Sequence, residues 1–286
     1  MQNNDLWIKT KEELLNEIHA DYPKGKMILW RIGQCGYVIK FNGKIILIDP
    51  VLNDIRDETR ISLRLYPVLF TPNDIEADFV ICTHAHADHL AEETVKKFAD
   101  KKNPPVFVVP AGCKKIMESL CPESSQIVYI KEGKTVKLTE TSIENEIAIS
   151  GISAAHPEHY FDENDERMAL CYYLKLGNYS LIHLGDTYLT PHLYGELLKI
   201  PSPDVFFPPI NGDDLFRKMM KYIGNMEAEE AAKLSVKIRA KTAIPTHYDM
   251  IIGNTADPNR FANEMIRLDR ASNYKILGLG EKLIIQ

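Results

Sequence analysis

Short apolar runs and amphipathic stretches alternate along most of the chain. Apolar runs of about four to eight residues, bounded by Gly, Pro, Asn or Asp, are typical of buried strands, whereas apolar residues spaced three and four apart predict helices. The runs predict strands at 27–32, 37–41, 44–48, 77–82, 106–110, 126–130, 134–138, 146–154, 169–176, 179–184, 204–207 and 242–245. The amphipathic stretches predict helices at 5–20, 91–99, 111–120, 190–199, 227–240 and 258–270, and we expect a final hairpin ending in Lys282-Leu283-Ile284-Ile285.

The order of these elements predicts an α/β fold. Strands predominate in the first part of the chain, and helices become more frequent toward its end. Two sheets packed face to face with helices on the outside would satisfy this pattern. Asn42-Gly43 between two strands is a strong hairpin signal. The region 1–22 should pack on the body as a helix, and 51–73, which lacks clear periodicity, should form a long excursion that could act as a lid. Because no repeat, low-complexity tract or linker is visible, we predict one domain over 1–286.

Composition narrows the classes of protein. A hydrophobic fraction of 45% is sufficient for a real core, and the net charge of −6 argues weakly against nucleic acid as the main partner. The cysteines are odd in number and show no CxxC spacing, which favours reduced thiols; they are Cys35, Cys82, Cys113, Cys121 and Cys171. The N-terminus has neither a basic start nor an apolar run, so we expect a cytoplasmic protein with no membrane segment.

Three histidines and one aspartate fall within six consecutive residues of the segment 83–90. These residues, His84, His86, Asp88 and His89, lie between a predicted strand and a predicted helix, which is a rigid place for a site. Imidazole nitrogens and carboxylate oxygens are ligands that Zn²⁺, Mn²⁺ and Fe accept. Because neighbouring side chains of a loop point to different sides, His84 and His86 could bind one metal while Asp88 and His89 bind another. The alternative is a polar turn that happens to be rich in histidine.

Three further metal-type residues follow apolar strands. His156 comes after the strand at 146–154, Asp186 after 179–184 and His247 after 242–245. Each alone could be a satisfied histidine or a turn aspartate. Taken together with the 83–90 segment, they favour side chains that converge on a metal site.

These residues resemble the five-part signature of the metallo-β-lactamase superfamily. The signature is matched by His84-x-His86-x-Asp88-His89, His156, Gly185-Asp186-Thr187 and His247, with Asp49 of Ile45-Ile46-Leu47-Ile48-Asp49-Pro50 at its first motif. The chain is most similar to the branch that contains ascorbate-6-phosphate lactonase. That similarity rests on Trp30-x-x-Gly33-Gln34-x-Gly36-Tyr37, His183-Leu184-Gly185-Asp186-Thr187, Pro208-Pro209-Ile210-Asn211-Gly212, Asn225-Met226-x-Ala228-x-Glu230-Ala231-Ala232 and Pro245-Thr246-His247-Tyr248-Asp249-Met250.

The resemblance implies a four-layer αβ/βα sandwich with two divalent metal ions, Mn or Zn foremost and Fe as an alternative, at one edge. It implies that one metal is bound by His84, His86 and His156, the second by Asp88, His89 and His247, and that Asp186 bridges them. Two such ions can hold a hydroxide between them at neutral pH. Asp49 and His183 suit positions that orient the ligand imidazoles, with a turn aspartate and a strand histidine as the alternatives.

The group that protonates the leaving group is less constrained by the sequence. Asp88, His159 and Tyr248 are candidates because they are ligands or lie close to ligands in the sequence, and a metal-bound water could do the same. His159 could instead be an alternative ligand or a residue of the rim.

Substrate-binding candidates are basic or hydrogen-bonding residues elsewhere. Arg56, Arg60 and Arg64 are spaced four apart, so a helical 51–73 segment would present them on one face to a phosphate or carboxylate. The favoured alternative is a solvated face that pairs with Asp54, Asp57 and Glu58. Further candidates that could bind an anion are Asn211, Arg217, Lys218 and Tyr248.

Three functions fit these observations. The first is hydrolysis of a lactone, carried by a small anionic metabolite such as a sugar-phosphate lactone. The second is hydrolysis of a phosphodiester or cyclic nucleotide, which the same centre supports. The third is a metal-binding scaffold without turnover. Self-association into a homo-oligomer is suggested by the lactonase resemblance alone.

Overall fold

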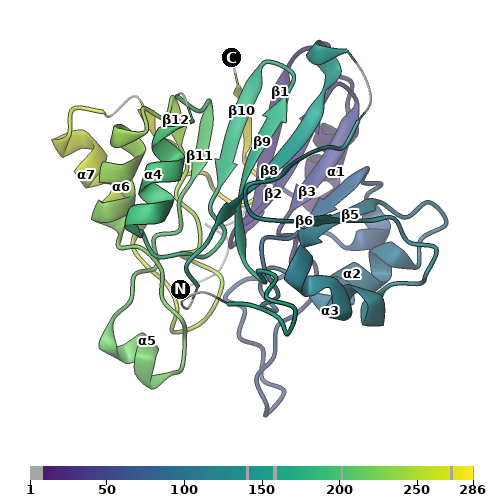
Figure 1. Cartoon of the computed structure of the whole chain (residues 1–286), viewed down its shortest axis with the longest axis horizontal. Helices are drawn as coiled ribbons and strands as arrows, with labels where there is room; N and C mark the ends of the chain where they lie inside the picture. Colours follow the sequence, from purple (N-terminus) through teal and green to yellow (C-terminus); the bar gives the residue numbers. More distant parts are fainter. Residues whose placement is uncertain (1–8, 140–141, 157–159, 201, 271–272, 286) are drawn as a thin grey trace.

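Two β-sheets form the centre of the protein (Figure 1). The computed structural model describes residues 9–139, 142–156, 160–200, 202–270 and 273–285. The first sheet has the order β13-β1-β2-β3-β4-β5-β6 and the second the order β12-β11-β10-β9-β8-β7. The strands of the first sheet are β1 (Met27–Gly33), β2 (Gly36–Phe41), β3 (Lys44–Ile48), β4 (Phe79–Ile81), β5 (Val106–Pro110), β6 (Ile127–Ile130) and β13 (Lys282–Ile285). Those of the second are β7 (Thr135–Lys137), β8 (Ile147–Ser153), β9 (Leu170–Leu176), β10 (Tyr179–His183), β11 (Val205–Phe207) and β12 (Thr242–Ala243).

Both sheets are mixed. In the first, β13, β1, β2 and β3 pair antiparallel, and β3, β4, β5 and β6 pair parallel. In the second, β7 to β10 pair antiparallel, and β10, β11 and β12 pair parallel. As a result β8, β10 and β12 run in the same direction, and their carboxyl ends lie at one edge of the second sheet.

Each sheet buries both of its faces, which explains why its strands read as continuous apolar runs. In β1, Met27 and Leu29 pack between the two sheets with Leu181 and Phe207 of the second sheet. The alternate residues Ile28, Trp30 and Ile32 belong to a separate core on the outer face of the first sheet. The period of two along a strand therefore divides one apolar run between two cores.

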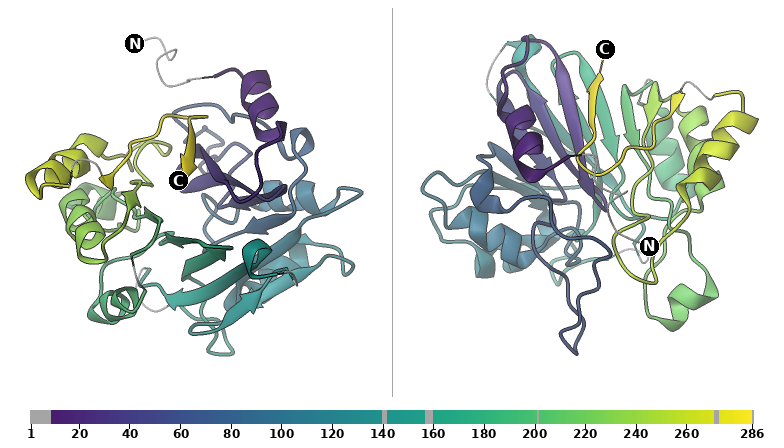
Figure 2. Two further views of the ribbon diagram at one scale, coloured as in Figure 1. Left: turned by 90° about the horizontal axis from the view of Figure 1, so that it is seen from above. Right: turned by 180° about the vertical axis from the view of Figure 1, so that it is seen from behind.

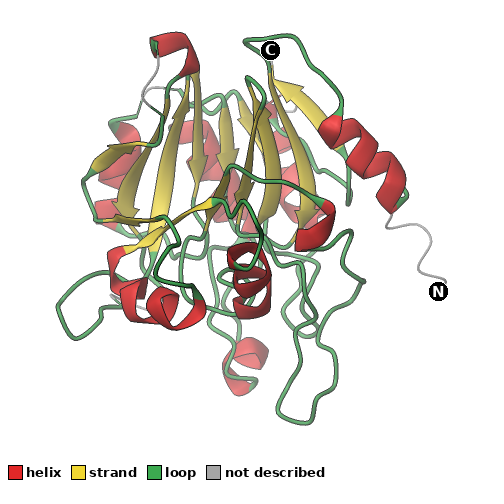
Figure 3. Cartoon of the chain, turned by 90° about the vertical axis from the view of Figure 1, so that its right-hand side faces the viewer, coloured by secondary structure: helices red, strands yellow, loops and turns green. Residues whose placement is uncertain are grey.

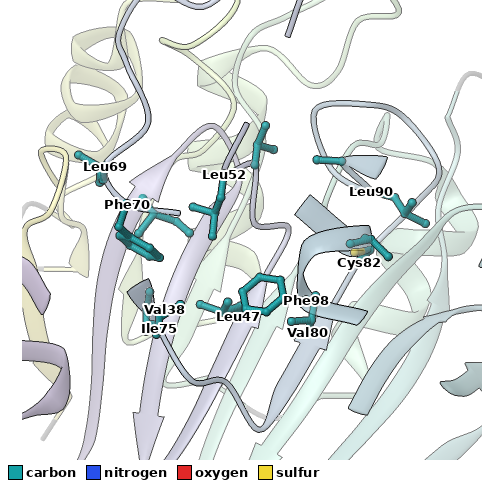
Figure 4. Close-up of a cluster of buried hydrophobic side chains, with 14 of the residues drawn as sticks. Val38, Leu47, Leu52, Leu69, Phe70, Ile75, Val80, Cys82, Leu90 and Phe98 are labelled. Atoms are coloured by element: carbon teal, nitrogen blue, oxygen red, sulfur yellow. The ribbon is translucent and has the colours of Figure 1, made fainter. Parts of the chain in front are cut away.

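Helices cover the two outer faces, which gives the predicted four-layer sandwich (Figure 2). The first sheet is covered by α1 (Lys11–His19), α2 (Glu92–Ala99) and α3 (Lys114–Leu120), and the second by α4 (Pro191–Leu198), α6 (Ala228–Lys237) and α7 (Pro258–Arg267). Figure 4 shows the core under α2, where Phe98 packs with Leu47 and Val80. The longest described helices, α6 and α7, have ten residues each, about half of what a bilayer requires.

The structure differs from the predictions at β13 and α5, and it shows the course of the 51–73 excursion and the start of the first helix. The last strand, β13, pairs with β1 and is not part of a terminal hairpin. The segment 51–73 is a long irregular excursion, as expected, with one 3₁₀ turn at its end (Pro72–Asp74) and no α-helix, so its arginines do not share a helical face. A short helix, α5 (Leu215–Met219), forms where no helix was predicted. The first predicted helix begins at Lys11, after a Thr10–Glu13 capping box, and residues 5–8 lie outside the described ranges.

Candidate metal centre

The seven candidate ligands lie on loops that leave the strands, and their donor atoms form overlapping groups. Figure 3 shows loops gathered at one end of the two sheets. The 83–90 loop follows β4, while His156, Asp186 and His247 follow β8, β10 and β12. An isolated bridge between His84 and Ala169 holds the 83–90 loop against the second sheet. Because β8, β10 and β12 are parallel, their carboxyl ends bring the other three candidates to the same place.

The first group consists of His84, His86 and His156. Nε2 of His84 lies 3.0 Å from Nδ1 of His86, and Nε2 of His156 lies 3.1 Å from the same atom. One nitrogen from each ring lies within 4.8 Å of the others. Three imidazoles that converge in this way match the ligand set of a divalent cation.

The second group consists of Asp88, His89 and His247. Oδ2 of Asp88 lies 3.3 Å from Nε2 of His247 and 3.8 Å from Nε2 of His89. These donor atoms also fall within 4.8 Å of one another. Asp88 is the most accessible of the three, with a side chain that is 21% exposed.

Asp186 lies between the two groups. Its Oδ1 is 3.3 Å from Nε2 of His89, and its Oδ2 is 3.1 Å from Nε2 of His247 and 3.6 Å from Nε2 of His156. One carboxylate therefore contacts members of both groups, which is the position expected of a bridging ligand.

Several of the buried donor atoms have no hydrogen-bond partner among the residues that the structure describes. They include Nε2 of His89, Nδ1 of His156 and Oδ1 of Asp186. The first and third lie 3.3 Å apart but lack hydrogen-bond geometry, so each presents a lone pair or a proton to the same small space. Buried polar groups are rarely left unpaired, and a cation would satisfy several of them at once. This set of imidazole and carboxylate donors fits Zn²⁺, Mn²⁺ or Fe²⁺.

The pKa values of the site residues also indicate that the carboxylates need positive charge beside them. Burial opposes ionisation of Asp186, but His247 and His89 hold the pKa of its carboxyl group well below the usual range. Burial acts to lower the pKa of His247, and the carboxylates of Asp186 and Asp88 outweigh it and raise that pKa to about 9. In contrast, burial lowers the pKa of His156 to about 4. The carboxylates thus remain ionised and require protons or cations beside them.

Asp49 anchors the 83–90 loop through contacts with Thr83 and His89. Its Oδ2 lies 2.7 Å from Nδ1 of His89 and accepts a hydrogen bond from the hydroxyl of Thr83, while its Oδ1 accepts from the Thr83 amide. Nε2 of His89 is thereby directed toward Asp186. Through this contact Asp49 is positioned to orient the imidazole of His89, a candidate ligand.

His183 takes a different position from the one expected. Its Nε2 lies 2.8 Å from the carbonyl oxygen of Cys35, and its Nδ1 accepts a hydrogen bond from the Gly185 amide. His183 therefore supports the turn that carries Asp186 and contacts no candidate ligand imidazole among the described residues.

A cleft of about 290 Å³ opens onto both groups. Its lining residues are Ile55, Leu63, His86, Ala87, Asp88, His156, Asp186, Lys221, Tyr222, Ile223, His247, Ile251 and Asn254. The predicted substrate contacts Arg60, Arg64, Asn211, Arg217 and Tyr248 do not line it. His159 lies outside the described ranges.

Most of these predicted substrate contacts form hydrogen bonds or ion pairs with other groups of the protein. The Arg64 guanidinium donates to the carbonyl oxygens of Val51, Asn53 and Tyr66. Arg217 donates to Asn254 and to the Thr255 carbonyl and pairs with Asp214, and the Asn211 amide donates to Asn254. The favoured alternative for the first arginine of the excursion is realised, because Arg56 pairs with Asp54.

Tyr248 is placed away from the chemistry although it follows His247 directly. Its hydroxyl donates to the carbonyl oxygen of Leu277, and the Arg31 guanidinium lies 4.6 Å from the centre of its ring. The side chain is buried, so the prediction that it protonates a leaving group is wrong for this geometry.

Sequence reasoning missed several residues of the site. Gln34 donates a hydrogen bond to Asp88, and Lys221, Tyr222 and Asn254 line the cleft. Cys35 forms a further group with His89 and Asp186, but burial raises the pKa of its thiol well above the usual range. Gln34 belongs to the motif Trp30-x-x-Gly33-Gln34-x-Gly36-Tyr37, but nothing in its local sequence indicates its contact with Asp88, 54 residues away.

Residues 44–248, well over half of the chain, match the family model of the beta-lactamase superfamily domain. The chain therefore belongs to this superfamily, and its two mixed sheets with outer helices form the metallo-β-lactamase fold.

Several of the proteins that the chain resembles are named metal-dependent hydrolases. It is 28% identical over 259 residues to a UPF0173 metal-dependent hydrolase of Bacillus cereus, a match that covers 86% of this chain and 95% of the relative. It is 25% identical over 253 residues to a UPF0173 metal-dependent hydrolase of Hyperthermus butylicus, covering 87% and 96%. The structure of a metallo hydrolase from Ignicoccus hospitalis superposes with a TM-score of 0.68 at 19% identity, covering 91% of this chain and 99% of that one.

Proposed function

We propose that the protein is a metal-dependent hydrolase with two divalent ions, held by the two groups of ligands and bridged by Asp186. The observation that carries this proposal is the contact of the one Asp186 carboxylate with His156 of the first group and with His89 and His247 of the second. The names of the relatives support the hydrolase class.

Divalent ions, when bound, lower the pKa of water and polarise a carbonyl or phosphoryl oxygen. The chain's own residues supply position and proton transfer. His84, His86 and His156 would hold one ion, and Asp88, His89 and His247 the other. Asp49 keeps the His89 ring oriented through its 2.7 Å contact with Nδ1.

Asp88 is the candidate that transfers a proton to the leaving group. It lines the cleft, and its carboxylate is the one partly exposed acid of the ligand set. Tyr248 does not line the cleft and so is not placed to protonate the leaving group, and a water molecule is the alternative proton donor.

The preferred substrate is a small ester or lactone with an anionic group, for which a sugar-phosphate lactone is the example drawn from the lactonase resemblance. A phosphodiester is the second candidate, because the same centre can hydrolyse it. A ring of arginines would favour a polyanion, but the cleft has only Lys221 as lysine or arginine among its described lining residues. A metal-binding scaffold without turnover is the third candidate function.

One experiment separates these functions. The purified protein is loaded with Mn²⁺ or Zn²⁺ and assayed against γ-butyrolactone and bis-p-nitrophenyl phosphate, before and after treatment with a chelator. Lactone hydrolysis that the chelator abolishes and metal restores supports the lactonase function, and turnover of the phosphodiester alone supports the second function. Activity on neither substrate, with metal bound by elemental analysis, would favour the scaffold.

A further inference from the structure

Four of the residues that line the cleft beside the candidate ligands are aliphatic, and they form an apolar wall. Ile55 and Leu63 come from the 51–73 excursion, Ile223 from the segment after α5, and Ile251 from the segment after His247. Ile55, Leu63 and Tyr222 pack against the outer core of the first sheet, of which Ile251 is a member. An apolar wall beside a metal centre is suited to the hydrocarbon part of a ligand.

Hydrogen bonds join the three segments of this wall. The Ile252 amide donates to the carbonyl oxygen of Leu63 at 2.9 Å, and the Tyr222 hydroxyl donates to the carbonyl oxygen of Ile252 at 3.0 Å. The bridge between Arg64 and Ile251 adds a third connection. The wall is therefore preformed and does not depend on a ligand to assemble it.

Exposed apolar side chains occur close in sequence to the wall residues. Four residues of α5 and its end, Leu215, Phe216, Met219 and Met220, are between 61% and 77% exposed. Ile61 of the excursion and Ile252 are also exposed. Both α5 and the excursion project from the same end of the molecule (Figures 1 and 2), and each is continuous in sequence with residues that line the cleft. Clustered exposed apolar side chains of this kind mark binding surfaces.

Lys221 follows directly after these apolar residues. It lines the cleft, is exposed, and has a backbone φ of 58°. Its ammonium group forms no ion pair with any described residue, whereas the neighbouring Arg217 and Lys218 pair with Asp214 and Asp213. Among the described residues Lys221 is thus a cation without an ion pair, next in sequence to the exposed Met220 and two residues before Ile223 of the wall.

We propose that the substrate is an amphipathic ester or lactone that carries an aliphatic chain and a single acidic group. The chain would lie along Leu63, Ile223 and Ile251 and leave the cleft beside Phe216 and Met219, and the acidic group would pair with Lys221. The proposal rests on the proposed function, because that function places the reacting ester group at the metal centre.

The direct test measures binding, so that it does not depend on turnover. Butyrate, hexanoate and octanoate are titrated into the metal-loaded protein by calorimetry. Each added methylene should lower the dissociation constant about two- to fourfold, the upper value corresponding to complete burial of the methylene. A dissociation constant independent of chain length overturns the proposal, whether or not lactones are hydrolysed.

Variants locate the binding surface. The double substitution Phe216→Ser with Met219→Ser should reduce the change in the dissociation constant to about 1.5-fold or less per added methylene. The methylenes of the ligand would then stay exposed to water, and an exposed methylene adds little binding free energy. Ile143→Ser is the matched control, since Ile143 is 76% exposed and lies outside the cleft, and it should keep the wild-type dependence. Lys221→Met should weaken octanoate binding about threefold and remove its salt dependence, and Lys221→Arg should restore both.

The remaining outcomes distinguish other occupants and the hydrolase proposal. A doubled mass in light scattering that the double variant returns to the monomer, together with no chain-length dependence, would assign the surface to a second copy and overturn the proposal. Binding to phosphatidylcholine vesicles without chain-length dependence in the titration would overturn it in favour of a membrane. Chain-length-dependent binding without hydrolysis of any lactone, ester or phosphodiester would keep the amphipathic acid as the ligand of this surface and remove the hydrolase proposal instead.

Discussion

The side-chain amide of Gln34 donates a hydrogen bond of 2.7 Å to Oδ2 of Asp88, and the same nitrogen lies 3.0 Å from Nε2 of His247. The amide therefore contacts the two residues of the second group that face the cleft. Gln34 is itself held in place, because its backbone amide donates to the Tyr66 hydroxyl. Its amide oxygen is buried and accepts no hydrogen bond from any described residue.

Gln34→Ala should weaken the more weakly held metal ion about tenfold, because the partner that orients Asp88 is lost. The measurement is a metal titration against a competing chelator. Gln126→Ala, on the surface, is the matched control and should leave both metal affinities unchanged. Equal affinities in Gln34→Ala and the wild type would show that the amide has no part in orienting the ligands.

Asp49→Asn should reduce both stability and metal affinity. Asn keeps the side-chain volume and tolerates the φ of 43° at this position, but it removes the charge from contacts to Thr83 and His89. We expect a loss of about 1–3 kcal/mol in the free energy of unfolding and about tenfold weaker metal binding. Asp165→Asn is the control, because Asp165 also has a positive φ but is exposed. Wild-type metal affinity in the destabilised Asp49 variant would confine Asp49 to a structural part.

Two glycine substitutions should have opposite effects on stability. Gly185 has a φ of 57°, and a Cβ there would lie 2.6 Å from Oγ1 of Thr83, so Gly185→Ala should cost about 2 kcal/mol or more. Gly195 lies within α4 with open space around its Cβ position, so Gly195→Ala should stabilise the protein by about 0.5–1 kcal/mol. Urea denaturation of both variants measures the difference, and equal midpoints would contradict this account of Gly185.

The stability contributed by Asp74 should depend on pH. Hydrogen bonds from the Lys11 ammonium and from Thr71 outweigh burial and lower the pKa of its carboxyl group to about 2. Because the folded-state pKa is depressed, the stabilisation is fully present above the unfolded value near 4 and is lost as the pH falls through about 2. Asp74→Asn should therefore cost about 1 kcal/mol at pH 7, after allowance for solvent screening, and less as the pH is lowered from 4 toward 2. Urea denaturation at several pH values tests this, with the exposed Asp269→Asn as control; a cost that is constant from pH 7 to pH 2.5 would be inconsistent with it.

The ligand candidates were predictable because four of them share the loop after β4 and each of the other three follows its own apolar strand. Parallel β8, β10 and β12 then bring His156, Asp186 and His247 together without further information. The partners of Arg64 and Arg217 were not predictable, because backbone carbonyls and Asn254 take their donors, and backbone carbonyls leave no signal in the sequence. The pairing of β13 with β1 joins the first and the last described strand of the chain, which local periodicity cannot indicate.

The proximity of Tyr248 to His247 in sequence was misleading for a similar reason. Adjacent residues at a strand end point in different directions, and Tyr248 turns toward Arg31 and the Leu277 carbonyl. The apolar wall of the cleft was also hidden, since Leu63, Ile223 and Ile251 come from three irregular segments whose association depends on the tertiary structure.

The most direct test of the central claim is the metal content of Asp186→Ala, measured by elemental analysis after loading and desalting. Circular dichroism should first show that the variant is folded. The account predicts about two equivalents of metal in the wild type and less than one in the variant, since loss of the shared carboxylate weakens both positions. Two tightly held ions in Asp186→Ala would contradict a bridging carboxylate, and with it the dinuclear centre on which the proposed hydrolysis depends.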